Sequence, residues 1–146
     1  MGRLVRWLAV LALVAWGPAF SQPAGAQPAV SEADRAAIIA TIEGQIAAFR
    51  RDDEAAAFAF ASPMIQGMFE TEARFMAMVR TLYPPVYRPR LVLFGELEEV
   101  GERLVQKVEL IGPDGAAALA LYTMIPGPDG WRIDGVALTA SEKLAA

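Results

Sequence analysis

Residues 91–134 read LVLFGELEEVGERLVQKVELIGPDGAAALALYTMIPGPDGWRID, and this stretch decides the fold. Its first half alternates apolar with charged residues, the two-residue period of strands that have one buried face. The tetrapeptide Gly-Pro-Asp-Gly occurs at 112–115 and again at 127–130. Proline suits the first corner of a turn, and the closing glycine can adopt a left-handed conformation. We therefore expect the chain after Arg90 to form an antiparallel meander.

The alternation predicts which strand residues share a face of the sheet. One face would carry Leu91, Leu93, Gly95 and Leu97, followed on the next strand by Leu104, Gln106, Val108 and Leu110. The other face would be largely charged. An apolar sheet face needs a cover, and only the segments upstream can supply one.

The upstream half is predicted to be helical. Ser31 is a suitable N-cap for a helix that begins near Glu32, because its hydroxyl can accept a hydrogen bond in the first turn. One apolar stripe follows at steps of three and four residues, made by Ile38, Ile42, Ile46 and Phe49.

Three further helix starts follow, at Asp52-Asp53, at Ser62-Pro63 and at Thr71. The last of these helices should bury Phe75, Met78, Val79 and Leu82, and Tyr83-Pro84-Pro85 should end it. Helices followed by hairpins make an α+β fold, with N-terminal helices packed on a curved antiparallel sheet of four or five strands.

Composition excludes many kinds of catalytic site. The 146 residues include no histidine and no cysteine, so disulfides, thiol nucleophiles, imidazole bases and the usual zinc sites are absent. We expect no cofactor. The methionines suggest a copper site as one alternative, but their helical spacing is more typical of core packing.

The N-terminus has the pattern of a secretory signal peptide over residues 1–26. Arg3 and Arg6 precede the apolar run Leu8–Trp16, and small residues at 24–26 suit cleavage. We expect a linker at 27–30, one domain at 31–146, and a periplasmic or secreted location. No stable membrane anchor is expected, since the run is shorter than the ~20 residues that a span needs.

Without the signal, 17 acidic side chains face 11 basic ones, and this acidic balance argues against nucleic acid as a partner. The segment Ala116–Ile125 is apolar or small on both faces, so its outer face should meet another chain, most simply in a homodimer through the sheet.

The candidate ligand-binding residues are Tyr83, Tyr87, Arg88, Arg90 and Gln106. The segment 83–90 combines phenols and guanidinium groups, which suit a small anion. Its alternative role is a rigid connector whose arginines pair with surface acids. Gln106 interrupts an apolar strand face and either lines a cavity or bonds a backbone end.

A further polar set lies near the C-terminus. With Tyr122, the residues Arg132 and Asp134 would make an acid–base cluster if they shared a cavity. Strict alternation instead turns Trp131 and Ile133 inward, which would leave Arg132 and Asp134 outside as an ion pair.

The element order and the closing strand Asp129–Ile133 resemble the nuclear transport factor two or SnoaL-like superfamily. More narrowly, the motifs Ala47–Arg50, Asp52-Asp53, Ala61–Pro63 and Tyr83–Arg90 resemble the bacterial family DUF4864. The resemblance implies a cone-shaped fold, which hosts enzymes and binding proteins alike.

Two functions follow from these expectations. The first is an exported, non-catalytic module that binds a small anionic or apolar ligand or a protein partner. The alternative is a cofactor-free isomerase or hydrolase that acts on a small apolar molecule in the cone. A pocket between helices and sheet that holds Gln106 and a tyrosine would favour the enzyme.

Overall fold

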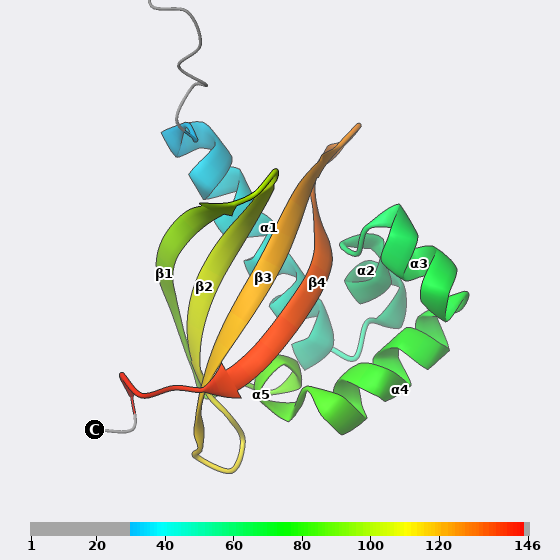
Figure 1. Cartoon of the computed structure of the whole chain (residues 1–146). Coiled ribbons are helices and arrows are strands. Elements are labelled where there is room, and N and C mark those ends of the chain that lie inside the picture. The colour runs from blue at the N-terminus through cyan, green and yellow to red at the C-terminus, as the bar shows by residue number, and fades with distance from the viewer. Residues whose placement is uncertain (1–29, 145–146) are drawn as a thin grey trace, which may run out of the picture.

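A computed structural model describes residues 30–144, in which five helices precede one antiparallel sheet (Figure 1). The helices are α1 (Glu32–Arg50), α2 (Glu54–Ala59), α3 (Pro63–Phe69), α4 (Glu72–Leu82) and α5 (Pro84–Tyr87). The strands are β1 (Leu91–Val100), β2 (Arg103–Ile111), β3 (Ala117–Gly127) and β4 (Gly130–Ala140), in the order β1-β2-β3-β4. The α+β meander expected from the sequence is confirmed.

The expected signal peptide at 1–26 and linker residues 27–29 lie outside the described residues. Within 30–144, none of the helices has the length and apolar character needed to cross a bilayer.

The helix starts are fixed by side-chain caps. Each predicted cap accepts a hydrogen bond from a backbone N–H of the first turn: Ser31 from Asp34, Asp53 from Ala56, Ser62 from Ile65 and Thr71 from Arg74. These bonds satisfy donors that a helix leaves free at its beginning, which is why the starts could be placed from sequence.

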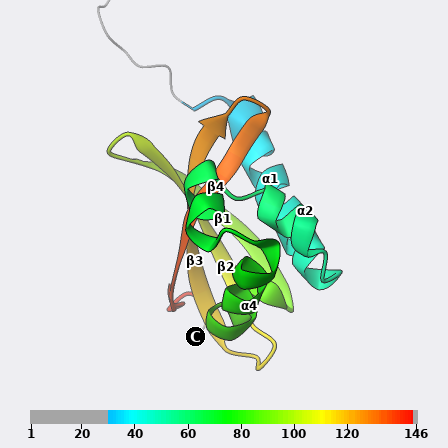
Figure 2. The same cartoon turned by 90° about the vertical axis from the view of Figure 1, so that its right-hand side faces the viewer.

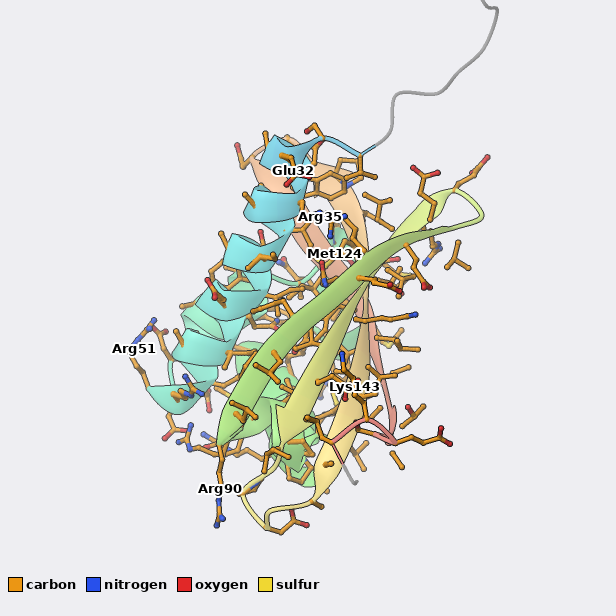
Figure 3. All side chains as sticks on the ribbon, turned by 90° about the vertical axis from the view of Figure 1, so that its left-hand side faces the viewer. Glu32, Arg35, Arg51, Arg90, Met124 and Lys143 are labelled. Carbon is orange, nitrogen blue, oxygen red and sulfur yellow. The ribbon has the colours of Figure 1, made fainter. Side chains whose placement is uncertain are left out.

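The long helix α1 lies along one face of the curved sheet (Figure 2). Its stripe Ile38, Ile42, Ile46 and Phe49 is buried as expected, and it joins a core that includes Val108, Leu110, Ala120 and Tyr122. Side chains fill the space between α1 and the sheet, and the fully buried Met124 lies among them (Figure 3).

A bulge in β1 changes the expected faces of that strand. The register with β2 shifts between Phe94 and Leu97, so Val92, Phe94 and Leu97 all pack against the core. Leu91 and Leu93 point away and are 41% and 45% exposed, so their expected place on the covered face was wrong. One inserted residue reverses the side-chain alternation beyond it.

A second register shift lies opposite Thr123 and Met124 and alters β4 in the same way. Ile133 and Asp134 are consecutive, and both are buried. The expected surface ion pair between Arg132 and Asp134 is therefore wrong, because the bulge turns the Asp134 carboxylate inward, where it pairs with Arg103.

The apolar residues of α4 are buried only in part. Phe75 and Val79 are buried as expected, but the methionine of α4 that is fully buried is Met76 and not Met78. Met78 is half-buried and Leu82 is 64% exposed, so the expected burial of Leu82 was wrong. The helix ends at Leu82 before the prolines, as expected, and Pro84–Tyr87 then forms the short helix α5.

Candidate functional site

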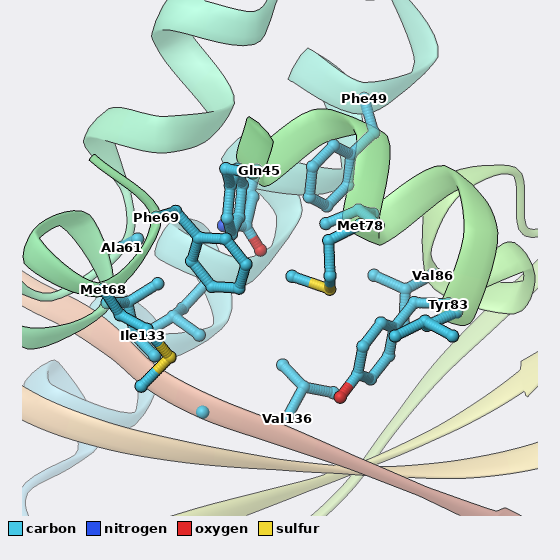
Figure 4. A pocket seen from close by; sticks show the side chains of 15 residues that line it. Gln45, Phe49, Ala61, Met68, Phe69, Met78, Tyr83, Val86, Ile133 and Val136 are labelled. Atoms are coloured by element: carbon cyan, nitrogen blue, oxygen red, sulfur yellow. The ribbon is translucent and has the colours of Figure 1, made fainter. Parts of the chain in front are cut away.

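An apolar cavity lies between the helices and the edge strand β4. It has a volume of about 340 Å³. Its walls come from the C-terminal half of α1, from α3, α4 and α5, and from β4 (Figure 4). The lining side chains are mostly aromatic, aliphatic or thioether groups: Phe49, Ala61, Ile65, Met68, Phe69, Phe75, Met78, Val79, Leu82, Val86, Ile133 and Val136.

The mouth of the cavity is marked by apolar residues that are both exposed and part of the lining. Met68 on α3 is 65% exposed, and Leu82 on α4 is 64% exposed. Helices α3 and α4 thus form the two sides of the cavity opening. Long flexible side chains at an opening can move aside for a ligand and then close over it.

Only two lining residues have polar side chains within the described part of the chain, Gln45 and Tyr83. Gln45 is 2% exposed, and its Nε2 donates to the carbonyl oxygen of Ala57 at 3.1 Å. This bond fixes which end of the amide faces α2. The amide oxygen is directed into the space beside Phe69 and Met78 (Figure 4) and accepts no hydrogen bond from residues 30–144.

The position of Gln45 in the sequence predicts that its side chain is buried. It lies three residues after Ile42 and four before Phe49, on the same stripe of α1. An amide at such a position is buried together with the apolar residues around it, so it needs a hydrogen-bond partner in the interior. The same argument holds for Gln106 on its strand.

The structure separates the expected binding residues of segment 83–90. Tyr83 lines the cavity, and its hydroxyl lies near Val136 (Figure 4). Tyr87 and Arg88 are not part of the lining, and Asp52 accepts hydrogen bonds from the Tyr87 hydroxyl and from Arg88 at 2.9 Å. Arg80 adds a third contact with Asp52 at 3.4 Å.

These contacts tie the end of α1 to α4 and α5. The Arg88 guanidinium also donates to the Phe49 carbonyl oxygen and stacks on the Tyr87 ring, with 4.2 Å between its central carbon and the ring centroid. The hydrogen bond from Tyr87 is the largest cause that lowers the pKa of Asp52 below its ordinary 3.8. Asp52 has φ 55°, a left-handed conformation that aspartate tolerates better than most residues.

Arg90 lies apart from this cluster. Its backbone N–H donates to Ile111 at 2.7 Å, and its side chain makes no salt bridge with any residue in the range 30–144. It borders a surface groove between α1 and β1, together with Glu43 and Arg50. Arg50 donates to the Pro89 carbonyl oxygen at 3.1 Å.

Gln106 does not line the apolar cavity. Its Nε2 donates to the carbonyl oxygens of Gly95 and Lys107, each at 2.9 Å, and so supports the bulge in β1. Its Oε1 and the hydroxyl of Tyr122, the residue opposite it on β3, are both buried without a partner among the described residues.

The polar residues Arg132, Asp134 and Tyr122 are not joined by hydrogen bonds within the described chain. Asp134 accepts from Ser62 at 2.7 Å and from Arg103 at 2.8 Å, while Arg132 donates to the Trp131 carbonyl oxygen. Burial raises the pKa of the Tyr122 phenol. These groups do not converge on a common space, since none of the three lines the apolar cavity.

The cavity can therefore hold an apolar molecule, but its described lining offers little acid–base chemistry. Tyr83 is the only titratable side chain among the lining residues in 30–144. General acid–base catalysis usually needs a second group that moves a proton in the opposite direction.

Comparison with family models gives one match, to the domain of unknown function DUF4864, over residues 31–146. Neither the comparison with curated proteins nor that with solved structures found a match. The match begins at the N-cap of α1 and covers every helix and strand described above. This chain belongs to the DUF4864 family.

Proposed function

We propose that this protein is an exported, non-catalytic module that binds a small, mainly apolar ligand in the cavity between α1, α3, α4, α5 and β4. The observation that carries the proposal is a cavity of about 340 Å³ with an almost wholly apolar lining, whose opening is bordered by the exposed apolar side chains of Met68 and Leu82. An engineered apolar cavity of about 150 Å³ takes up benzene. The present volume therefore suits a body of about two fused rings, or about ten carbons.

Binding is favoured over catalysis because of the lining. A cofactor-free isomerase or hydrolase would need a base and an acid near the substrate, and the described lining supplies only the Tyr83 phenol as a titratable group. The pocket does hold a glutamine and a tyrosine, but the glutamine is Gln45 and not the expected Gln106.

An apolar ligand is favoured over an anion for a separate reason. Arg88 is already engaged by Asp52, by the Phe49 carbonyl oxygen and by the Tyr87 ring. A guanidinium held in this way must give up a charge-assisted bond before it can receive an anionic ligand. The segment 83–90 is better explained as a connector that positions Tyr83 at the cavity.

Export, superfamily and assembly belong to the same proposal. The residues at 1–26 support export to the periplasm or medium, and helices on a curved sheet support a relation to the SnoaL-like superfamily. The outward Leu91 and Leu93 support a homodimer through the sheet. Light scattering tests the dimer, and Leu93→Glu should reduce the measured mass to that of a monomer.

Naphthalene is a suitable probe of the cavity, since it has two rings and no polar group. We expect it, near its aqueous saturation, to raise the melting temperature of the wild-type protein, because a ligand that binds only the folded state stabilises it. Met78→Trp should abolish this shift by filling the space between Phe69 and Tyr83, where Met78 lies (Figure 4).

Met64→Trp is the matched control. Met64 is 53% exposed on α3 and is not part of the lining. Stabilisation that survives in Met64→Trp but is lost in Met78→Trp supports binding in the cavity. Equal shifts in all three proteins, or no shift in the wild type, would count against it.

A further inference from the structure

We infer that the ligand of this cavity is neutral and carries a hydrogen-bond donor, such as a hydroxyl or N–H group, on an apolar body. The inference rests on the proposed function and adds the chemistry of the ligand's polar group. It depends on which atom of Gln45 faces the cavity and on where the cationic side chains of the chain are held.

Gln45 presents an acceptor to the cavity. The bond from its Nε2 to the Ala57 carbonyl oxygen fixes the amide, because a flipped amide would set two oxygens against each other. The Oε1 atom then faces an apolar space in which the described chain gives it no donor. This oxygen is thus an acceptor that is reached from the cavity, and a ligand hydroxyl or N–H placed there would supply the donor that the described lining does not.

A ligand with a carboxylate group would bind weakly in this cavity. The carboxylate presents only acceptors to the Gln45 oxygen, and it would lose its hydration on entry. No cationic residue in the range 30–144 is part of the lining. Arg80 of α4 and Arg88, which follows α5, contact Asp52.

The cavity is also too apolar for a ligand with many polar groups. Apart from Gln45, the described lining has a polar side chain only at Tyr83, whose hydroxyl lies across the space near Val136 (Figure 4). A polar group on the ligand's interior end would therefore lie near Gln45, while the rest of the body would contact Phe69, Met78 and Phe49. One donor and an apolar remainder match this distribution.

Three compounds with the same ring system test the inference: naphthalene, 2-naphthol and 2-naphthoate. Dissociation constants are measured with the full-length chain at pH 7 by calorimetry or by ligand-induced thermal shift. We expect 2-naphthol to bind about fivefold more tightly than naphthalene, since one neutral hydrogen bond has a net effect of about that size. We expect 2-naphthoate to bind at least about tenfold more weakly than 2-naphthol, because its charge must be desolvated.

Gln45→Met assigns the preference to the amide. This variant keeps the side chain's length and loses both polar atoms. The ratio of the two dissociation constants, naphthalene to 2-naphthol, should fall to about 1 in it, and using a ratio removes any general loss of stability from the comparison. Tyr83→Phe should keep the preference near its wild-type value.

The outcomes separate the two proposals. If none of the three compounds binds, the proposed cavity function fails. If naphthalene binds as well as 2-naphthol, or 2-naphthoate binds best, the cavity function stands and the inference about a neutral donor is wrong. A preference that persists in Gln45→Met but disappears in Tyr83→Phe would also overturn it.

Discussion

The Ser62 hydroxyl donates a 2.7 Å hydrogen bond to Asp134, which lies 72 positions later in the chain. The same serine caps α3, and its backbone N–H donates to the Ile133 carbonyl oxygen at 2.8 Å. The Ile133 N–H in turn donates to Phe60 at 2.9 Å. One residue thus starts a cavity-lining helix and fastens it to the edge strand β4, so the two walls of the cavity share an anchor.

Ser62→Ala should destabilise the protein by about 2 kcal/mol. The change removes the helix cap and also leaves one oxygen of the buried Asp134 carboxylate without its donor. Urea unfolding at pH 7 measures the loss. Thr71→Ala is the matched control, because Thr71 caps α4 through Arg74 N–H but is exposed. It should lose only about 1 kcal/mol, and equal losses in the two variants would contradict a role for the Asp134 bond.

The lowered pKa of Asp52 predicts how the stability of the protein changes at acidic pH. Its folded pKa lies below the ordinary 3.8, chiefly because of the Tyr87 hydroxyl. A carboxyl group with a depressed folded pKa stabilises the protein above its unfolded pKa, and this stabilisation is lost as the pH falls through the folded value. Asp52→Asn should therefore lower the urea midpoint at pH 7, and the difference from wild type should disappear between about pH 4 and pH 2.

Asp129→Asn serves as the comparison for Asp52→Asn, since Asp129 lies in the β3–β4 turn and has no salt bridge among the described residues. Its midpoint should follow that of the wild type across the same pH range. A difference at Asp52 that stays constant down to pH 2 would show that the substitution acts through the altered hydrogen bonds with Tyr87 and Arg88 and not through the charge of the carboxylate.

Arg88 and Arg90 should respond differently to the same substitution. Arg88→Gln removes a 2.9 Å contact with Asp52 and the stacking on Tyr87, so it should lower the melting temperature by a few degrees. Arg90→Gln should leave it nearly unchanged, because the Arg90 bond to Ile111 is made by the backbone. Thermal denaturation checks both. Similar shifts in the two variants would mean that the Asp52 contact contributes little.

The sequence predicted the parts of the fold that depend on local chemistry. The caps Ser31, Asp53, Ser62 and Thr71 each need only the first turn of their own helix, and all four were placed correctly. The hairpins at the two Gly-Pro-Asp-Gly turns were also confirmed. Errors arose where one residue changes the relation between strands, as at Gly95 and Asp134, because alternation counts carry no information about a bulge.

A pocket between the helices and the sheet was considered, but its place and its lining were not predicted, and the reason is physical. Helical periodicity shows which side of α4 turns toward the protein, and Met78 and Leu82 do lie on that side. It does not show whether atoms from other elements fill the space opposite them. Of the five expected binding residues, only Tyr83 lines the cavity. Tyr87, Arg88 and Arg90 were chosen for the unusual composition of their segment, and Gln106 for its place on the apolar strand face, which lies away from this cavity.

Tyr122→Phe provides the last prediction. The Tyr122 ring is fully buried, and its hydroxyl has no hydrogen-bond partner among residues 30–144. Removing an unsatisfied buried hydroxyl relieves its desolvation while the ring keeps its packing. The variant should be as stable as wild type or more stable by about 1 kcal/mol at pH 7, measured by urea unfolding.

The burial of Tyr122 also predicts how the stability of the protein changes at alkaline pH. Burial raises the folded pKa of Tyr122 above its ordinary 10.0. An acid with a raised folded pKa gives stability that is fully present below the unfolded pKa and is lost as the pH rises toward the folded value. Wild-type stability should therefore fall more steeply above pH 10 than that of Tyr122→Phe, which has no phenol to ionise at that position. Parallel curves for the two proteins would show that the folded pKa of Tyr122 is not raised, and a clear loss of stability in Tyr122→Phe at pH 7 would indicate that the hydroxyl donates to a partner such as the Gln106 Oε1 opposite it on β2.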